Sequence, residues 1–166
     1  MKVKIILSLA FIIILNSAYA QGKAEKKEKN KEQYKEIIEL LKSGEYNFIA
    51  NRANSQNGKS INLSSNYFLT ISNGIANADL PFFGESYIVN TSTGSAGIKF
   101  NDSVSDYEIK EKGKILRVQI RFQVETFQDL YNCTLNVSNS GFADLTIYSR
   151  SRSTISYDGK VSAIMK

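Results

Sequence analysis

In the segment 115–124, apolar and polar side chains alternate from Leu116 to Val124, and this alternation constrains the fold more than any other feature. Successive side chains of a β-strand point to opposite faces, so such a segment forms a strand with one dry and one solvated face. The apolar positions are Leu116, Val118, Ile120, Phe122 and Val124, and the polar positions are Arg117, Gln119, Arg121 and Gln123. Strands of this kind belong to antiparallel sheets, so we expect the chain to be mainly β.

Turn sequences connect neighbouring strands in registers that agree with this pattern. We predict loops at Asn73-Gly74, Lys112-Gly113, Asn139-Ser140-Gly141 and Asp158-Gly159, with Gly141 left-handed. The first three loops place apolar residues opposite each other, in the pairs Leu69–Ala78, Ile71–Ala76, Ile109–Leu116, Val137–Ala143 and Leu135–Leu145. On the outer face Glu108 falls opposite Arg117, which is a favourable pair. The fourth loop closes a hairpin between 155–157 and 160–163.

These patterns predict an antiparallel meander of about ten strands. Less regular strands are expected at 46–51, 59–64, 86–89 and 97–100. Because so many twisted strands curl or split, the meander forms either a barrel or a sandwich. The sequence leaves both architectures open.

A charged segment precedes the strands. Lys and Glu residues alternate over 23–45, and only the second half carries an apolar stripe at helical spacing, formed by Tyr34, Ile37, Ile38 and Leu41. We therefore predict one N-terminal amphipathic helix, at 31–43, with one face packed on the sheet. Residues 21–30 form a charged, flexible lead-in.

Residues 1–20 have the organisation of a secretory signal peptide. Lys2 and Lys4 give a positive start, Ile5–Leu15 is almost entirely apolar, and Ala18-Tyr19-Ala20 is a small-x-small cleavage pattern. The apolar run is shorter than the ~20 residues that span a bilayer. We expect a single β-rich domain at 31–166, exported to the periplasm or the cell exterior, with no membrane span after removal of the signal.

Composition excludes several kinds of site. The chain has no His and one Cys, Cys133, which rules out His/Cys zinc sites, His-based triads and an intrachain disulfide. Cys133 lies on the inward parity of its strand, where we expect a small buried hydrophobe. The net charge is +5, but the basic residues form no clustered stripe, so no nucleic-acid partner is expected. We predict no catalytic residue, no metal and no cofactor.

Carboxylates are the remaining route to acid–base chemistry. Glu125 and Asp129 lie close together in the sequence, near an irregular junction. Asp144 is expected on the outer face of its strand, and Asp158 in a turn. A glycosidase needs two carboxyl groups that face each other across one cleft. Since the sequence brings no two of these carboxylates together in that way, we interpret all four as solvated surface.

A long loop flanked by aromatic residues is the candidate binding surface. Pro81-Phe82-Phe83-Gly84 holds two adjacent rings that cannot both face the core of a regular strand, and the loop Glu85–Gly97 follows. Arg150 and Arg152 share one parity and project together toward an anionic group if the strand continues. The plainer alternatives are a bulge that tucks both rings inward and a basic edge that only discourages strand addition. The predicted surface consists of Phe82, Phe83, Tyr87, Arg150 and Arg152.

Several motifs together resemble a known family. They are Leu80-Pro81-Phe82-Phe83-Gly84-Glu85-Ser86-Tyr87, Gly97-Ile98-Lys99-Phe100, Ser140-Gly141-Phe142-Ala143-Asp144-Leu145 and Arg152-Ser153-Thr154-Ile155-Ser156-Tyr157-Asp158-Gly159. With the Lys/Glu helix behind a signal peptide, they resemble domain of unknown function 4251, a family of exported bacterial proteins. The resemblance covers about residues 30–165 and implies export in a double-membraned bacterium, hence the periplasm. It implies no activity, ligand or catalytic residue.

The favoured interpretation is a non-catalytic binding or interaction module of the bacterial envelope. Its partner is an envelope protein or a small apolar ligand. One alternative is a hydrolase of envelope or glycan material that works by carboxylates. The other is a structural or assembly partner that uses its Lys/Glu-rich helix as an arm, with the stripe of Ile37 and Leu41 exposed to water.

Overall fold

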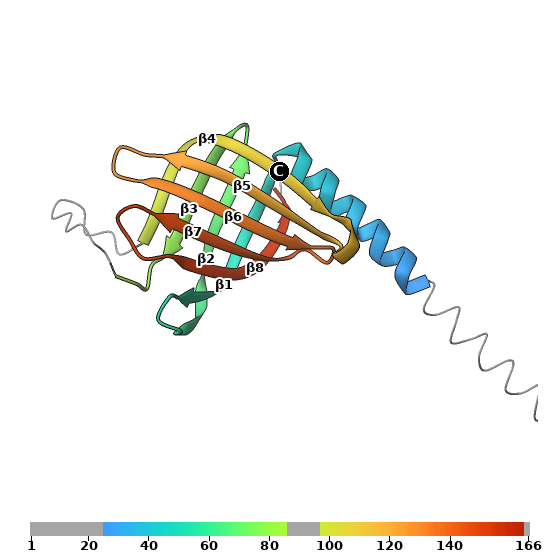
Figure 1. Cartoon of the computed structure of the whole chain (residues 1–166), viewed down its shortest axis with the longest axis horizontal. Coiled ribbons are helices and arrows are strands. Elements are labelled where there is room, and N and C mark those ends of the chain that lie inside the picture. Colours follow the sequence, from blue (N-terminus) through green and yellow to red (C-terminus); the bar gives the residue numbers. More distant parts are fainter. Residues whose placement is uncertain (1–24, 86–96, 165–166) are drawn as a thin grey trace, which may run out of the picture.

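The computed structural model describes residues 25–85 and 97–164. Eight antiparallel strands follow one another around a closed barrel, in which the last strand pairs with the first (Figure 1). The strands are β1(Tyr46–Ser55), β2(Ser60–Ser72), β3(Ile75–Pro81), β4(Gly97–Lys112), β5(Arg117–Glu125), β6(Leu130–Ser138), β7(Phe142–Ser149) and β8(Ile155–Ala163). The architecture is therefore the barrel, and not the sandwich that the sequence left open.

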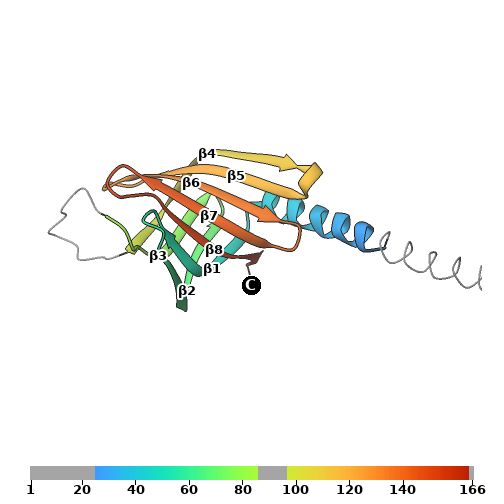
Figure 2. The same cartoon turned by 60° about the horizontal axis from the view of Figure 1, so that its bottom comes forward.

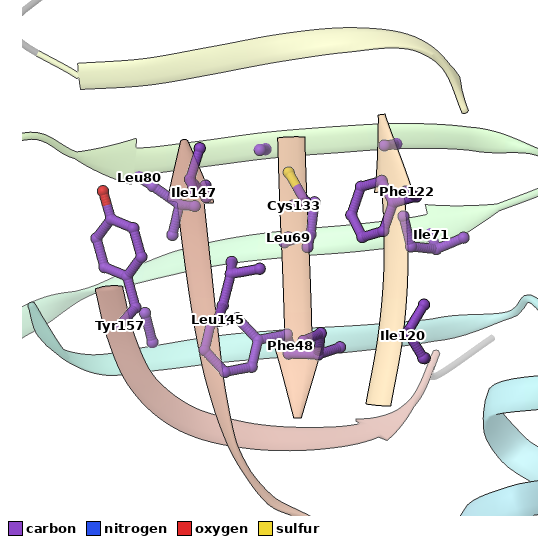
Figure 3. Close-up of a cluster of buried hydrophobic side chains, with 14 of the residues drawn as sticks. Phe48, Leu69, Ile71, Leu80, Ile120, Phe122, Cys133, Leu145, Ile147 and Tyr157 are labelled. Atoms are coloured by element: carbon purple, nitrogen blue, oxygen red, sulfur yellow. The ribbon is translucent and has the colours of Figure 1, made fainter. Parts of the chain in front are cut away.

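The barrel interior is the hydrophobic core. In β5 the residues at even positions from Val118 to Val124 are buried, as the alternation predicts, and the odd positions face outward. Side chains from the surrounding strands point into this interior, among them Phe48, Phe122 and Leu145 (Figure 3). An eight-stranded barrel is just wide enough for its own side chains to fill it.

The strands β2, β4 and β8 are longer than the sequence indicates, so the described residues contain eight strands where the sequence predicts about ten in the whole chain. The segment 59–64 and the strand that follows it belong to the single strand β2, and 97–100 is the start of β4, the longest strand. A residue with positive φ, Asp106, interrupts the pairing of β4 with β5 but does not end the strand. The predicted strand 86–89 lies outside the described residues.

Two predicted hairpins have the expected register. Around Asn73-Gly74, Ile71 pairs with Ala76 and Leu69 with Ala78. Around Asn139-Ser140-Gly141, the predicted pairs of β6 with β7 form, and Gly141 has a φ of +82°. Both turns lie between strands that are adjacent in the chain, so local turn chemistry sets their register.

The predicted two-residue turn at Lys112-Gly113 is wrong. A 3₁₀ turn, η1(Gly113–Ile115), and the left-handed Leu116 (φ 50°) form a longer connection. Glu108 consequently pairs with Arg121 and not with Arg117, and Ile109 pairs with Ile120. The new register keeps the same parity, so the buried face of β5 is unchanged.

The predicted turn at Asp158-Gly159 is also wrong, because β8 continues through both residues. Gly159 pairs with Ala50 of β1 and Ala143 of β7. A Cβ atom on Gly159 would overlap the carbonyl oxygen of Ile49 and lie 2.7 Å from carbons of the Phe48 ring. This glycine therefore permits close approach of β1 to β8, which is the other common reason for glycine inside a strand.

The N-terminal helix packs at one end of the barrel. It is helical from residue 25, the first described residue, to residue 43, so part of the predicted lead-in at 21–30 is helical. Figures 1 and 2 show it beside the β4–β5 connection, pointing away from the strands. Within the described parts of the chain, no helix combines the length and the apolar character needed to span a bilayer.

The apolar stripe of the helix is the face that contacts the barrel. Leu41 is fully buried and Ile37 packs against the core. The Tyr34 hydroxyl donates to the carbonyl oxygen of Arg117 at 3.1 Å, and the Tyr107 hydroxyl donates to that of Leu41 at 3.2 Å. The alternative in which the helix acts as an arm requires this stripe to be exposed to water. The stripe instead packs against the barrel.

Candidate functional site

The predicted binding surface lies at the barrel end away from the helix, where segment 150–154 meets segment 82–85. The backbone N–H of Ser153 donates to the carbonyl oxygen of Glu85 at 2.9 Å, and its Oγ accepts from the Glu85 N–H at 3.1 Å. Arg152 Nη1 donates to the carbonyl oxygen of Gly97 at 2.8 Å, and its guanidinium lies 5.2 Å from the centroid of the Phe82 ring. Arg152 therefore links the connection between β7 and β8 to Phe82, which follows β3, and to Gly97 at the start of β4.

The other predicted residues do not join them in one site. Phe83 is 38% exposed and Arg150 is exposed, but only Arg150 lines the hollow of about 280 Å³ beside the β5–β6 connection. Tyr87 lies outside the described residues.

Asp129, one of the two carboxylates singled out in the sequence, is a structural hub of the same barrel end. Its carboxylate accepts hydrogen bonds from the hydroxyls of Ser149 and Ser151 and from the backbone N–H groups of Leu130 and Arg150. Partial burial acts to raise the pKa of Asp129, but these four bonds favour the ionised form and together hold the pKa below its ordinary value. Asp129 thus organises the β5–β6 and β7–β8 connections.

A row of polar side chains on the outer face of the barrel is the more developed site. Each member sits directly opposite the next on the neighbouring strand, from β5 through β6, β7, β8 and β1 to β2. In that order the row is Gln119, Asn136, Asp144, Asp158, Arg52 and Asn62. We refer to these six residues as the polar row.

Hydrogen bonds connect most of the polar row. Gln119 Nε2 donates to Asn136 Oδ1 at 2.8 Å, and Asn136 Nδ2 donates to Asp144 Oδ2 at 2.8 Å. On the other side, Asn54 Nδ2 donates to Asp158 Oδ2 at 3.1 Å, and Arg52 Nε lies 3.8 Å from the same oxygen. These contacts hold the amide and carboxylate groups in fixed positions.

All members of the polar row except Gln119 line a cleft of about 520 Å³. Its walls include Arg117, Ser138 and Phe142, together with the backbone around Gly159. This volume is in the range of small-molecule sites, which is ~300–1,000 Å³. We refer to this hollow as the outer cleft.

Irregular pairing of β1 creates the outer cleft. Ala50 pairs with Gly159 and Arg52 pairs with Asp158, so Asn51 is an extra residue on β1. On the β2 side, residues 63–66 fall between consecutive pairs. Such bulges bend a strand and increase its twist. The tip of the β1–β2 hairpin extends below the barrel in Figure 1, while Arg52 remains paired with Asp158 of β8 and with Asn62 of β2.

Four charged groups of opposite sign balance one another in the outer cleft. Arg52 and Arg117 supply two positive charges, and Asp144 and Asp158 supply two negative ones. Phe142 adds an aromatic ring that is 63% exposed, with the Lys160 ammonium 5.9 Å from its centroid. The lining residues thus offer hydrogen-bond donors, acceptors and one apolar face with balanced charges, and Lys160, which is not a lining residue, adds one positive charge beside Phe142.

Comparison with known proteins places this fold in a family. The sequence profile of the family described as Domain of unknown function (DUF4251) matches residues 28–161. The chain belongs to this family. No curated protein matches it.

A solved DUF4251 structure has the same fold. The crystal structure of a DUF4251 family protein from Bacteroides eggerthii DSM 20697 superposes with a TM-score of 0.63 at 19% sequence identity. The match covers 79% of this chain and 87% of that chain. The likeness confirms the barrel fold of the DUF4251 domain and extends to no ligand or activity.

Sequence reasoning missed the outer cleft of this DUF4251 domain. Asp144 was correctly expected on an outer face, but Asp158 was placed in a turn, so the two carboxylates were not brought together. The remaining signal was the outward parity of Gln119, Asn136 and Asp144 on three successive strands. The closing pair of β1 with β8 adds Arg52, and no local pattern indicates that pair.

Proposed function

We propose that this DUF4251 protein is an exported, non-catalytic binding module of the bacterial envelope, and that its ligand lies in the outer cleft. The observation that supports this most strongly is the polar row, of which five side chains from five strands line one hollow. Fixed hydrogen-bonding groups reduce the entropy that a protein loses on binding. The clefts on both the wall and the loop end are lined mainly by polar residues, which favours a polar ligand over an apolar one.

Export to the periplasm is part of this proposal. It rests on the signal-peptide pattern of residues 1–20, with its positive start, apolar run and cleavage site. The free Cys133 is compatible with an oxidising compartment because it is buried inside the barrel. A buried thiol finds no partner for disulfide formation.

A binding role fits the available side chains better than covalent catalysis. Burial raises the pKa of the Cys133 thiol far above its ordinary value, which keeps it protonated and unreactive. In the part of the chain that the structure describes, no three His, Cys, Asp or Glu side chains cluster as metal ligands do. In the outer cleft, Asp144 and Asp158 instead accept hydrogen bonds from asparagine amides, and Asp158 also pairs with Arg52.

One observation favours the hydrolase alternative. Asp144 and Asp158 are directly opposite each other on β7 and β8 and line the same cleft. A glycosidase requires at least two carboxyl groups that face the same space. Release of reducing ends from an envelope glycan, lost in the Asp144→Asn and Asp158→Asn variants, would establish hydrolysis in place of simple binding.

Saturation-transfer NMR with a chemically diverse panel tests the binding proposal. The panel contains neutral sugars, uronic acids, amino acids, a nucleotide and a fatty acid, each mixed with the protein lacking residues 1–20. We expect at least one class to give a signal that Asn136→Ala abolishes and Arg150→Ala retains. The matched variants separate the outer cleft from the loop end. A signal lost only in Arg150→Ala, or no signal from any class, would overturn the proposal.

A further inference from the structure

We propose that the ligand of the outer cleft is a neutral saccharide that stacks on Phe142 and hydrogen-bonds to Asn136, Asp144 and Asp158. This inference rests on the proposed function, because it names the chemical class that the same site would bind. It follows from the charge balance of the cleft, from its mixture of donors and acceptors, and from the exposed ring at its wall.

The charge balance favours a neutral ligand. An anion near Arg52 and Arg117 would also face the carboxylates of Asp144 and Asp158, and a cation would meet the reverse arrangement. For a charged ligand, repulsion by the side chains of like charge cancels the attraction of the side chains of opposite charge. A neutral molecule with many polar groups meets no such penalty and can contact all four side chains.

The donors and acceptors match hydroxyl groups. A sugar hydroxyl both donates and accepts a hydrogen bond, and so requires both kinds of partner. Carboxylates accept only, guanidinium groups donate only, and Asn136 does both. Asn136 donates one bond to Asp144, and a carboxylate has ~four acceptor positions. The cleft floor therefore retains capacity for several hydroxyls beyond its internal bonds.

The position of the two aspartates suits neighbouring hydroxyls. Asp144 and Asp158 form a directly opposed pair on the outer face, and Cβ atoms of such pairs lie ~4.5–5.5 Å apart. Two acceptors at that separation address adjacent hydroxyls on one ring. Asn136 and Asn54 hold them in place from either side, so their orientation precedes binding.

Phe142 supplies the apolar surface that a pyranose ring also needs. It lies two positions before Asp144 on β7, on the same outer face, and 63% of it is exposed. One face of a pyranose carries mainly C–H groups, and burial of this face against an aromatic ring removes apolar area from water. Hydroxyls at the ring edge then point toward the polar row.

Tyr148 is a matched control for this role. It belongs to the same strand and the same outer parity and is 56% exposed, but it does not line the cleft. Truncation of Tyr148 removes a similar exposed aromatic surface from β7. It should leave a ligand of the outer cleft undisturbed.

Isothermal titration calorimetry with defined sugars tests the saccharide assignment. The probes are glucose, galactose, mannose, N-acetylglucosamine and their β-1,4 disaccharides, with glucuronate and glucosamine as charged counterparts of similar size. At least one neutral sugar should bind, more tightly than either charged counterpart. Phe142→Ala should weaken it about ten-fold, equivalent to ~1.4 kcal/mol, and Tyr148→Ala should change it less than two-fold. Circular dichroism of each variant verifies the fold.

Three results would overturn the assignment. The first is absence of binding by every neutral sugar, and the second is tighter binding of glucuronate or glucosamine. The third is an equal effect of Phe142→Ala and Tyr148→Ala. If another class of the NMR panel binds in the cleft while neutral sugars do not, the saccharide assignment fails and the binding module stands. If nothing binds in the cleft, both fail.

Discussion

Asp144 and Asp158 face each other across β7 and β8, with Arg52 on the next strand as the nearest compensating charge for Asp158. Two like charges placed directly opposite on a sheet destabilise it. Arg52 and the amides of Asn54 and Asn136 offset this repulsion. The outer cleft therefore combines a repulsive pair with its own neutralising groups.

Replacement of Arg52 by Met is expected to lower stability through the aspartate pair. Arg52 and Asp158 are both about half exposed, so the loss should be small, ~0.5–1 kcal/mol, and smaller in high salt. Adding Asp158→Asn should restore the free energy of unfolding. Urea denaturation at 20 and 500 mM salt measures both. Lys99→Met, which breaks the separate Lys99–Asp79 pair, is the control that Asp158→Asn should not rescue.

Replacement of Gly159 by Ala should destabilise the barrel where it closes. The added methyl group would overlap the Ile49 carbonyl oxygen and press on the Phe48 ring, and overpacking of this kind costs ~1–3 kcal/mol or more. Gly113→Ala, with nothing within 4 Å of the new atom, should be close to neutral. Thermal unfolding compares the two variants. Equal melting temperatures would contradict the close approach of β1 and β8.

Truncation of Leu41 tests the docking of the helix. Leu41 is fully buried, so Leu41→Ala should cost ~2–5 kcal/mol. Ile115→Ala, at a residue that is 60% exposed, should cost much less. Hydrogen exchange in segment 25–43 should accelerate in Leu41→Ala only. Unchanged exchange and stability would mean that the helix is a free arm after all.

The stability of the protein should fall in acid through Asp129. Because the folded pKa of this carboxyl lies below its unfolded value, its contribution is complete above the unfolded pKa of about 4 and disappears as the pH falls through the folded pKa. Asp129→Asn should therefore be less stable than the natural chain at pH 6, and the difference should shrink toward pH 2. Asp102→Asn, at an exposed position, should show no such convergence. A constant difference for Asp129→Asn would exclude this role.

The sequence predicted what is decided locally. Alternation identified the buried positions of β5, and the Asn73-Gly74 turn fixed its own register, since both depend on residues adjacent in the chain. Asp158-Gly159 is the same kind of dipeptide, yet its glycine serves a contact with β1 that turn chemistry cannot reveal.

The outer cleft could not be predicted because it depends on the closing pair of strands. Asn54 and Asp158 share a hydrogen bond although they are 104 positions apart. The register between β1 and β8, and the bulge at Asn51, decide that Arg52 stands beside Asp158. The contact of Arg152 with the carbonyl oxygen of Gly97, 55 positions away, likewise depends on the closed barrel and has no local sequence signal.

Amide chemical-shift mapping of the whole domain tests the central claim most directly, because it locates any ligand without prior choice of a site. The experiment records ¹⁵N spectra during titration with the tightest-binding neutral sugar. We predict that the largest shifts fall on Arg52, Asn136, Asp144 and Asp158 and their strand neighbours. Shifts confined to segments 82–85, 126–129 and 150–154, or absent altogether, would contradict a ligand site on the wall of the barrel.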